Sequence, residues 1–71
     1  MRIEPGMIAV VTGGGSGIGR ALTRRLSAAG VHVATCDVSQ PGLEETRTLA
    51  LKDAPAGTRV SIFRADVSQE A

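Results

Sequence analysis

Short apolar runs alternate with longer amphipathic segments along the chain, and this alternation predicts the order of its elements. Residues 7–12 (Met-Ile-Ala-Val-Val-Thr) form a continuous run of strand length that ends in glycines. Such a run is typical of a strand buried on both faces, as in a parallel sheet covered by helices. From about Gly17 to Ala29 the spacing becomes helical, and Gly30 supplies a stop signal. The stripe expected to face the core is Ile18, Ala21, Leu22, Leu26 and Ala29.

The same pattern then repeats. Residues 31–36 predict a second strand, which Asp37 closes. Ser39 and Pro41 are typical of a helix start, because serine caps free N–H groups and proline suits the first turn. We expect this helix to continue to about Asp53.

A third strand follows a break. The segment 54–57 (Ala-Pro-Ala-Gly) ends the second helix, and residues 58–65 predict a strand with Val60 and Ile62 on one face. Residues 66–71 are expected to form a turn that enters a new helix.

The order β-α-β-α-β predicts right-handed crossovers and a parallel sheet. The expected fold class is therefore α/β, a Rossmann-type βαβαβ half of a doubly wound sheet, with residues 1–71 forming the N-terminal portion of a single domain. Without a fourth strand beside the first, Ile8 to Val11 would leave an open apolar edge, which is a pairing liability. We therefore expect a domain cut before its fourth strand.

Composition narrows the function classes. Eight Lys+Arg residues against seven Asp+Glu residues give a net charge of +1, so no strong field indicates nucleic acid or an anionic membrane as a partner. One cysteine and one histidine exclude a disulfide scaffold and a Cys/His zinc site, and no metal site is expected. The apolar run near the N-terminus is too short for a signal peptide or a membrane span, so the expected location is the cytoplasm.

Five glycines fall within seven residues at the predicted junction between the first strand and the first helix. Glycines let backbone approach a ligand closely, and a helix N-terminus offers free N–H groups and partial positive charge, so this turn can hold a phosphate. The strict G-x-G-x-x-G pattern does not fit, because Ile18 or Arg20 occupies the third glycine position. The triphosphatase pattern fails as well, since Arg20-Ala21 stands where Lys-Ser/Thr is required.

The pattern that does fit is T-G-x-x-x-G-x-G, formed by Thr12, Gly13, Gly17 and Gly19. It closely resembles the cofactor loop of the short-chain dehydrogenase/reductase family. The resemblance implies an oxidoreductase that transfers hydride between a nicotinamide cofactor and an alcohol or carbonyl substrate. The loop residues that would hold the dinucleotide are Gly13, Gly14, Gly15, Ser16, Gly17, Ile18 and Gly19.

Two further features match this family, a strand-closing acid and an Asp-Val pair. Asp37, at the end of the second strand, can accept hydrogen bonds from the adenosine ribose and repel a 2′-phosphate. Relatives that prefer NADP often carry a basic residue at the positions of Ser16 and Val38, so the resemblance favours NAD over NADP. Asp66 and Val67 resemble the pair that frames adenine in the family.

The family's catalytic residues have no counterpart here. Its Tyr-x-x-x-Lys pair, serine and asparagine lie further along, and this chain has no tyrosine or asparagine. Lys52, in the second predicted helix, cannot replace the catalytic lysine. We therefore expect the chain to bind the adenosine half of the cofactor without catalysis, and the resemblance implies a homo-oligomeric parent.

Two alternatives stay open: a stand-alone nucleotide-binding or interaction module, and a flavin- or adenosylmethionine-binding unit, which the loop spacing disfavours. The basic stretch Arg20, Arg24 and Arg25 is expected to be a solvated face, with Arg20 placed to assist the phosphates.

Overall fold

A computed structural model of the chain describes residues 4–65. The elements follow the predicted order, and their bounds differ from the expected ones by one or two residues. They are β1 (Ile8–Thr12), α1 (Gly17–Ala28), β2 (His32–Asp37), α2 (Gln40–Asp53) and β3 (Val60–Arg64). The helix start expected within residues 66–71 lies outside the described residues.

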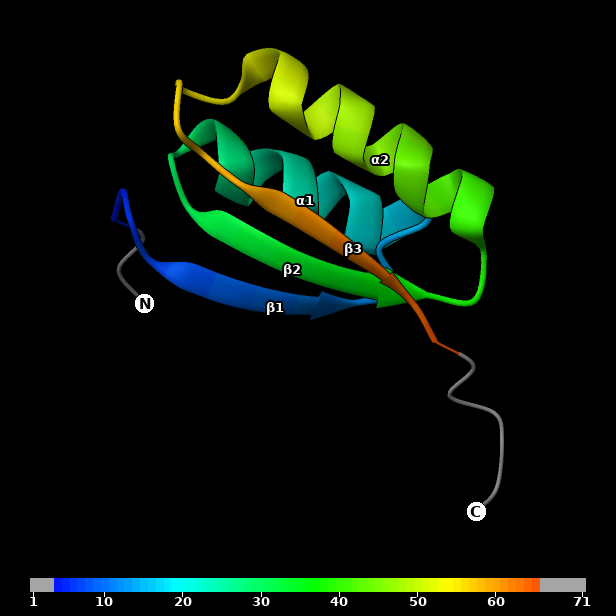
Figure 1. The fold of residues 1–71 in the computed structure, drawn as a ribbon. Helices are drawn as coiled ribbons and strands as arrows, with labels where there is room; N and C mark the ends of the chain where they lie inside the picture. The colour runs from blue at the N-terminus through cyan, green and yellow to red at the C-terminus, as the bar shows by residue number, and fades with distance from the viewer. Residues whose placement is uncertain (1–3, 66–71) are drawn as a thin grey trace.

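The described strands form one parallel sheet in the order β1-β2-β3 (Figure 1). Val11 of β1 pairs with Thr35 of β2, and Thr35 pairs with Ile62 of β3. Both crossover helices lie on the same side of this sheet (Figure 1). The α/β class and the Rossmann-type βαβαβ half are thereby confirmed, and the outer edge of β1 has no neighbouring strand among the described residues.

The two faces of the sheet differ sharply in exposure. Val11, Val33 and Val60 face the helices and are almost completely buried. Ile8 and Val10 alternate with Val11 along β1, and each is 76% exposed. The expectation that β1 is buried on both faces is therefore wrong for the described residues, because both helices cover the same face. A continuous apolar run indicates a strand but not which layers cover it.

The buried stripe of α1 also differs from the expected one. Ile18 is 88% exposed and Leu22 is 45% exposed, whereas Thr23 and Ser27 are fully buried beside Leu26. Ser27 faces α2, where its hydroxyl donates to the Ala50 carbonyl at 3.4 Å, and both hydroxyl residues have a hydrogen-bond acceptor on the backbone of their own helix. Thr23 Oγ1 donates to the Gly19 carbonyl at 2.8 Å, and Ser27 Oγ donates to the Arg24 carbonyl at 3.2 Å. Small, internally satisfied residues can line a close helix–helix contact, which apolar periodicity alone does not predict.

The helix ends follow the predicted signals. Gly30 adopts a φ of +85° just after α1, which is the left-handed conformation expected of a helix stop. Ser39 caps α2 by accepting a hydrogen bond from the Gly42 N–H at 3.1 Å. Leu43 and Thr46 of α2 are completely buried. Neither helix in residues 4–65 combines the length and apolar character that a bilayer crossing requires.

Candidate functional site

The glycine loop lies against the carboxyl end of β2. The N–H groups of Gly13 and Gly14 both donate to the Cys36 carbonyl, at 2.8 and 3.1 Å. These bonds continue the hydrogen bonding between β1 and β2 just past the last paired residues, Thr12 and Cys36. They place the loop beside Asp37. In open α/β sheets, ligands bind at this carboxyl edge of the strands.

Glycine is required in the loop for two different reasons. Gly13 and Gly17 have φ values of +72° and +58°, which residues with a side chain rarely adopt. Gly14 is instead limited by space, because a Cβ atom there would lie 1.7 Å from Thr35 Oγ1. Thr35 is itself buried and donates to the Val11 carbonyl at 2.9 Å, so it has little freedom to move. The loop can therefore keep its close approach to the sheet only with glycine at these positions.

α1 begins within this loop, at Gly17. Ser16 is the N-cap residue, but its side chain makes no capping hydrogen bond, and the first turn of α1 has no acidic residue. The N–H groups of Gly17, Ile18 and Gly19 belong to that first turn, where an α-helix provides no carbonyl to accept them. Such a terminus has the polarity to hold an anionic group such as a phosphate. The described residues thus fit a dinucleotide pyrophosphate at this position.

Asp37 is bound to the same loop through its carboxylate. Its Oδ2 accepts from the Gly15 N–H at 2.8 Å, and its Oδ1 accepts from the Val38 N–H at 2.6 Å. These hydrogen bonds, with a further one from the Ser39 backbone, lower the pKa of Asp37 below its ordinary value against a smaller opposing effect of burial. The carboxylate is therefore ionised at neutral pH, and these three hydrogen bonds leave it acceptor capacity for a hydroxyl donor.

A pocket of about 190 Å³ lies beside this carboxylate. Its volume is below the roughly 300–1,000 Å³ of complete small-molecule sites, so it would hold one part of a dinucleotide rather than all of it. A larger hollow of about 470 Å³ includes Ile8, His32 and Arg59 at the amino ends of the strands, and no glycine-loop residue lines it. The smaller pocket is lined by Thr12, Gly13, Cys36, Asp37, Val38 and Ala65.

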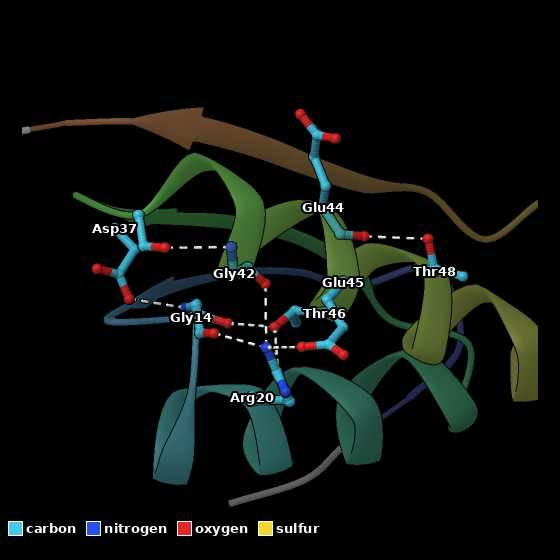
Figure 2. A network of polar contacts seen from close by, with 10 residues as sticks. Gly14, Arg20, Asp37, Gly42, Glu44, Glu45, Thr46 and Thr48 are labelled. Carbon is cyan, nitrogen blue, oxygen red and sulfur yellow. Dashed lines mark hydrogen bonds and ion pairs between the residues drawn. The ribbon is translucent and has the colours of Figure 1, made fainter.

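Arg20 differs from its expected role. Its side chain is only 23% exposed and lies between the glycine loop and α2, where it pairs with Glu45 at 2.9 Å (Figure 2). Arg24, one turn further along, is 46% exposed and lies 3.7 Å from Asp53. The expectation of a solvated basic face therefore holds for Arg24 and the exposed Arg25 but is wrong for Arg20.

The structure thus brings the glycine loop, Asp37 and Val38 to one edge of the sheet. Asp66 and Val67, the expected adenine contacts, lie outside the described residues. Sequence reasoning missed Gly42 and Thr46 of α2: a Cβ atom at Gly42 would lie 2.6 Å from the Gly15 carbonyl oxygen, and the Thr46 hydroxyl donates to the Gly14 carbonyl. The only signal for Gly42 was a glycine in the first turn of a helix, and none marked Thr46. No group of histidine, cysteine, aspartate or glutamate side chains in residues 4–65 could hold a metal ion.

The sequence profile of the short chain dehydrogenase family matches residues 7–71, nearly the whole chain. The chain belongs to the short-chain dehydrogenase family. Levodione reductase of Leifsonia aquatica is 45% identical over 64 residues, which cover 90% of this chain and 24% of that relative. The (3R)-3-hydroxyacyl-CoA dehydrogenase of Homo sapiens is 42% identical over 66 residues, covering 87% of this chain and 25% of the relative.

Solved structures of short-chain dehydrogenases share the fold described above. Levodione reductase superimposes with a TM-score of 0.86 at 41% identity, over 93% of this chain and 25% of its own. An enzyme from Burkholderia phymatum in complex with NAD gives a TM-score of 0.80 at 35% identity, over 97% and 24%. A metagenomic short-chain oxidoreductase in complex with NADP also gives 0.80, at 28% identity, over 96% and 29%. The chain thus spans about a quarter of the length of the curated relatives it matches.

Membership in this family confirms the resemblance inferred from the glycine loop and places the chain among dehydrogenases and reductases. The family uses NAD or NADP, and both cofactors occur among the structural neighbours.

Proposed function

We propose that residues 1–71 form part of one dinucleotide-binding domain and bind the adenosine and pyrophosphate portions of NAD. The observation that carries this proposal is the Asp37 carboxylate, which is hydrogen-bonded to the Gly15 N–H within the family's glycine loop. The contact holds the Asp37 carboxylate close to the N-terminus of α1, which supports a site that takes the ribose and the pyrophosphate together.

The proposed contacts divide among three positions. The first-turn N–H groups of α1, from Gly17 to Gly19, hold the pyrophosphate, and the exposed Ile18 lies beneath the cofactor. Asp37 accepts from the ribose hydroxyls. Asp66 and Val67 frame adenine, which the family resemblance supports.

Preference for NAD over NADP rests on charge. The ionised Asp37 would repel a 2′-phosphate, since hydrogen bonds from Gly15 and Val38 keep its pKa low. Ser16 and Val38 are exposed and carry no positive charge that could compensate. This uncompensated carboxylate supports NAD as the cofactor.

The proposed activity of the whole enzyme is hydride transfer between the cofactor and a small alcohol or carbonyl substrate, in a homo-oligomer. The bound nicotinamide supplies or accepts the hydride. None of the 71 residues matches the family's catalytic tyrosine, since the sequence contains no tyrosine. The part assigned to these residues is to bind and orient the adenosine end of the cofactor.

Isothermal titration of the chain with NAD and with NADP tests this proposal. We expect Asp37→Ala to weaken NAD binding about tenfold, because a hydrogen bond to a charged acceptor is lost. The variant should also reduce the difference between the affinities for NAD and NADP. Asp53→Ala is the matched control, because this exposed carboxylate lies at the far end of α2. Unchanged affinities for both cofactors in Asp37→Ala would refute the ribose assignment, and failure of the unaltered chain to bind NAD would refute the proposed function.

A further inference from the structure

The side chain of Arg20 connects the glycine loop to the first turns of α2 (Figure 2). Its Nη2 donates to the Gly15 carbonyl at 2.7 Å and to the Gly42 carbonyl at 3.2 Å. Its Nε donates to Thr46 Oγ1 at 2.8 Å. One guanidinium group therefore bonds to the loop and to two successive turns of the neighbouring helix.

Thr46 extends this connection to a second loop peptide. Its hydroxyl accepts from Arg20 and donates to the Gly14 carbonyl at 2.6 Å. Thr46 is completely buried, so water cannot replace either bond without a rearrangement. Arg20 thus acts on the carbonyl of Gly15 directly and on the carbonyl of Gly14 through Thr46.

Holding these two carbonyls sets the direction of two N–H groups. In a planar trans peptide the C=O and the following N–H point in opposite directions. The peptide that carries the Gly14 carbonyl also carries the Gly15 N–H, which donates to Asp37 Oδ2 at 2.8 Å. The peptide that carries the Gly15 carbonyl also carries the Ser16 N–H, which must face away from Arg20. Ser16 is the N-cap residue of α1, so this N–H lies where the proposed pyrophosphate site begins.

The positive charge of Arg20 is already matched within the protein. Glu45 Oε1 lies 2.9 Å from Nη2, and three oxygen atoms of the loop and α2 accept hydrogen bonds from the side chain. A guanidinium group surrounded in this way orients its neighbours through its fixed fork geometry rather than by attracting a distant phosphate.

We propose that Arg20 is a positioning residue for the cofactor loop: with Thr46 it orients the Gly15 and Ser16 N–H groups toward Asp37 and the pyrophosphate. The proposal rests on the proposed function in one respect, the identity of the ligand that the loop receives. The orientation of the loop itself is a property of the chain without ligand, so the two can be tested apart.

A charge-balanced pair of variants separates positioning from charge. The test variant Arg20→Met/Glu45→Gln removes one arginine from α1 and one carboxylate from α2. The control variant Arg24→Met/Asp53→Asn makes the same change at the neighbouring ion pair, which does not touch the loop. Both variants keep the net charge of the chain, and heteronuclear NMR spectra of each report whether it is folded.

Two measurements follow on each variant. Amide hydrogen exchange without ligand should accelerate at least about tenfold for the Gly15 N–H in the test variant, because Thr46, which bonds to its peptide, loses the hydrogen bond from Arg20 that orients it. In the control variant the exchange rate should stay within about twofold of the unaltered chain. Titration with NAD should give an affinity about tenfold weaker in the test variant only, with an unchanged dependence on salt concentration. Arg20→Lys should not restore the affinity, since an ammonium group lacks the planar fork.

Several outcomes would overturn the proposal. Unchanged exchange at Gly15 would show that Arg20 does not orient the loop, whether or not NAD binds. An affinity for NAD in Arg20→Lys equal to that of the unaltered chain would show that Arg20 attracts the phosphates directly by its charge. A weaker salt dependence of NAD binding in the test variant would show the same. If the test variant does not fold, Thr46→Val removes only the buried hydroxyl, and normal exchange at Gly15 in that variant would equally refute the proposal. If loop exchange responds as expected but the unaltered chain does not bind NAD, the proposed function fails and the positioning role stands.

Discussion

Gly19 offers the sharpest test of the packing between the glycine loop and α1. Alanine is favoured over glycine inside a helix by about 1 kcal/mol, so helix propensity alone predicts that Gly19→Ala stabilises the chain. The structure predicts the opposite, because a Cβ atom at this position would lie 2.1 Å from the Gly13 carbonyl oxygen. That atom belongs to the backbone and cannot rotate away.

The cost follows from how far the loop would have to move. The Cβ atom would lie more than about 1 Å inside ordinary van der Waals contact with Gly13, so the peptide there must shift by a similar distance. The Gly13 and Gly14 N–H groups both bond to the Cys36 carbonyl, and such a shift would break or weaken those bonds. Overpacking costs about 1–3 kcal/mol and each lost hydrogen bond about 1 kcal/mol, which outweighs the gain in propensity. We expect a net loss of about 2 kcal/mol in the free energy of unfolding.

Urea denaturation followed by circular dichroism measures this loss. Ala21→Gly is the matched control, because Ala21 is exposed in the same helix and should lose about 1 kcal/mol from propensity alone. Both variants, Gly19→Ala and Ala21→Gly, should therefore be less stable than the unaltered chain, although helix propensity alone predicts opposite effects for the two. If Gly19→Ala is as stable as the unaltered chain or more stable, the argument is refuted. If Gly19→Ala fails to fold while Ala21→Gly folds, the expected loss of stability is confirmed and is larger than calculated.

Two further predictions concern the charge and the core. The folded-state pKa of Asp37 is lowered, so its carboxylate stabilises the fold above the ordinary aspartate pKa of about 3.9, and this contribution disappears as the pH falls through the folded-state value. In Asp37→Asn, the free energy of unfolding, measured by urea denaturation, should therefore fall less steeply as the pH is lowered. A fall as steep as that of the unaltered chain would contradict this. Leu43→Ala should lose about 2–5 kcal/mol because Leu43 is completely buried, whereas Leu51→Ala should lose about 1 kcal/mol or less because Leu51 is 42% exposed. Equal losses in thermal or urea denaturation of these two variants would show that the helix–sheet core is misassigned.

Most of the fold could be predicted from local signals. The glycine cluster, the caps at Ser39 and Gly30 and the strand-length apolar runs each act within a few residues, so their order along the chain was sufficient for the βαβαβ arrangement. The same holds for part of the site. Asp37 follows a strand whose carboxyl end meets the loop because parallel strands place these ends together, and the Gly15–Asp37 contact agrees with that expectation.

The burial pattern could not be predicted in the same way. Ile18 and Val10 are apolar but exposed, while Thr23 and Thr46 are polar but completely buried. Residue type was a poor guide here because burial depends on which neighbours cover each face. Both crossovers placed their helices on one side of the sheet, and the contact between those helices includes the small hydroxyl residues Ser27 and Thr46.

The sequence by itself determined the order of the elements and the family, because the loop spacing and the strand-closing aspartate are local patterns. Only the tertiary structure decided the role of Arg20. Its partners Gly42 and Thr46 lie 22 and 26 residues away along the chain. They meet Arg20 because α1 and α2 pack side by side, and no local pattern marks a contact across that distance.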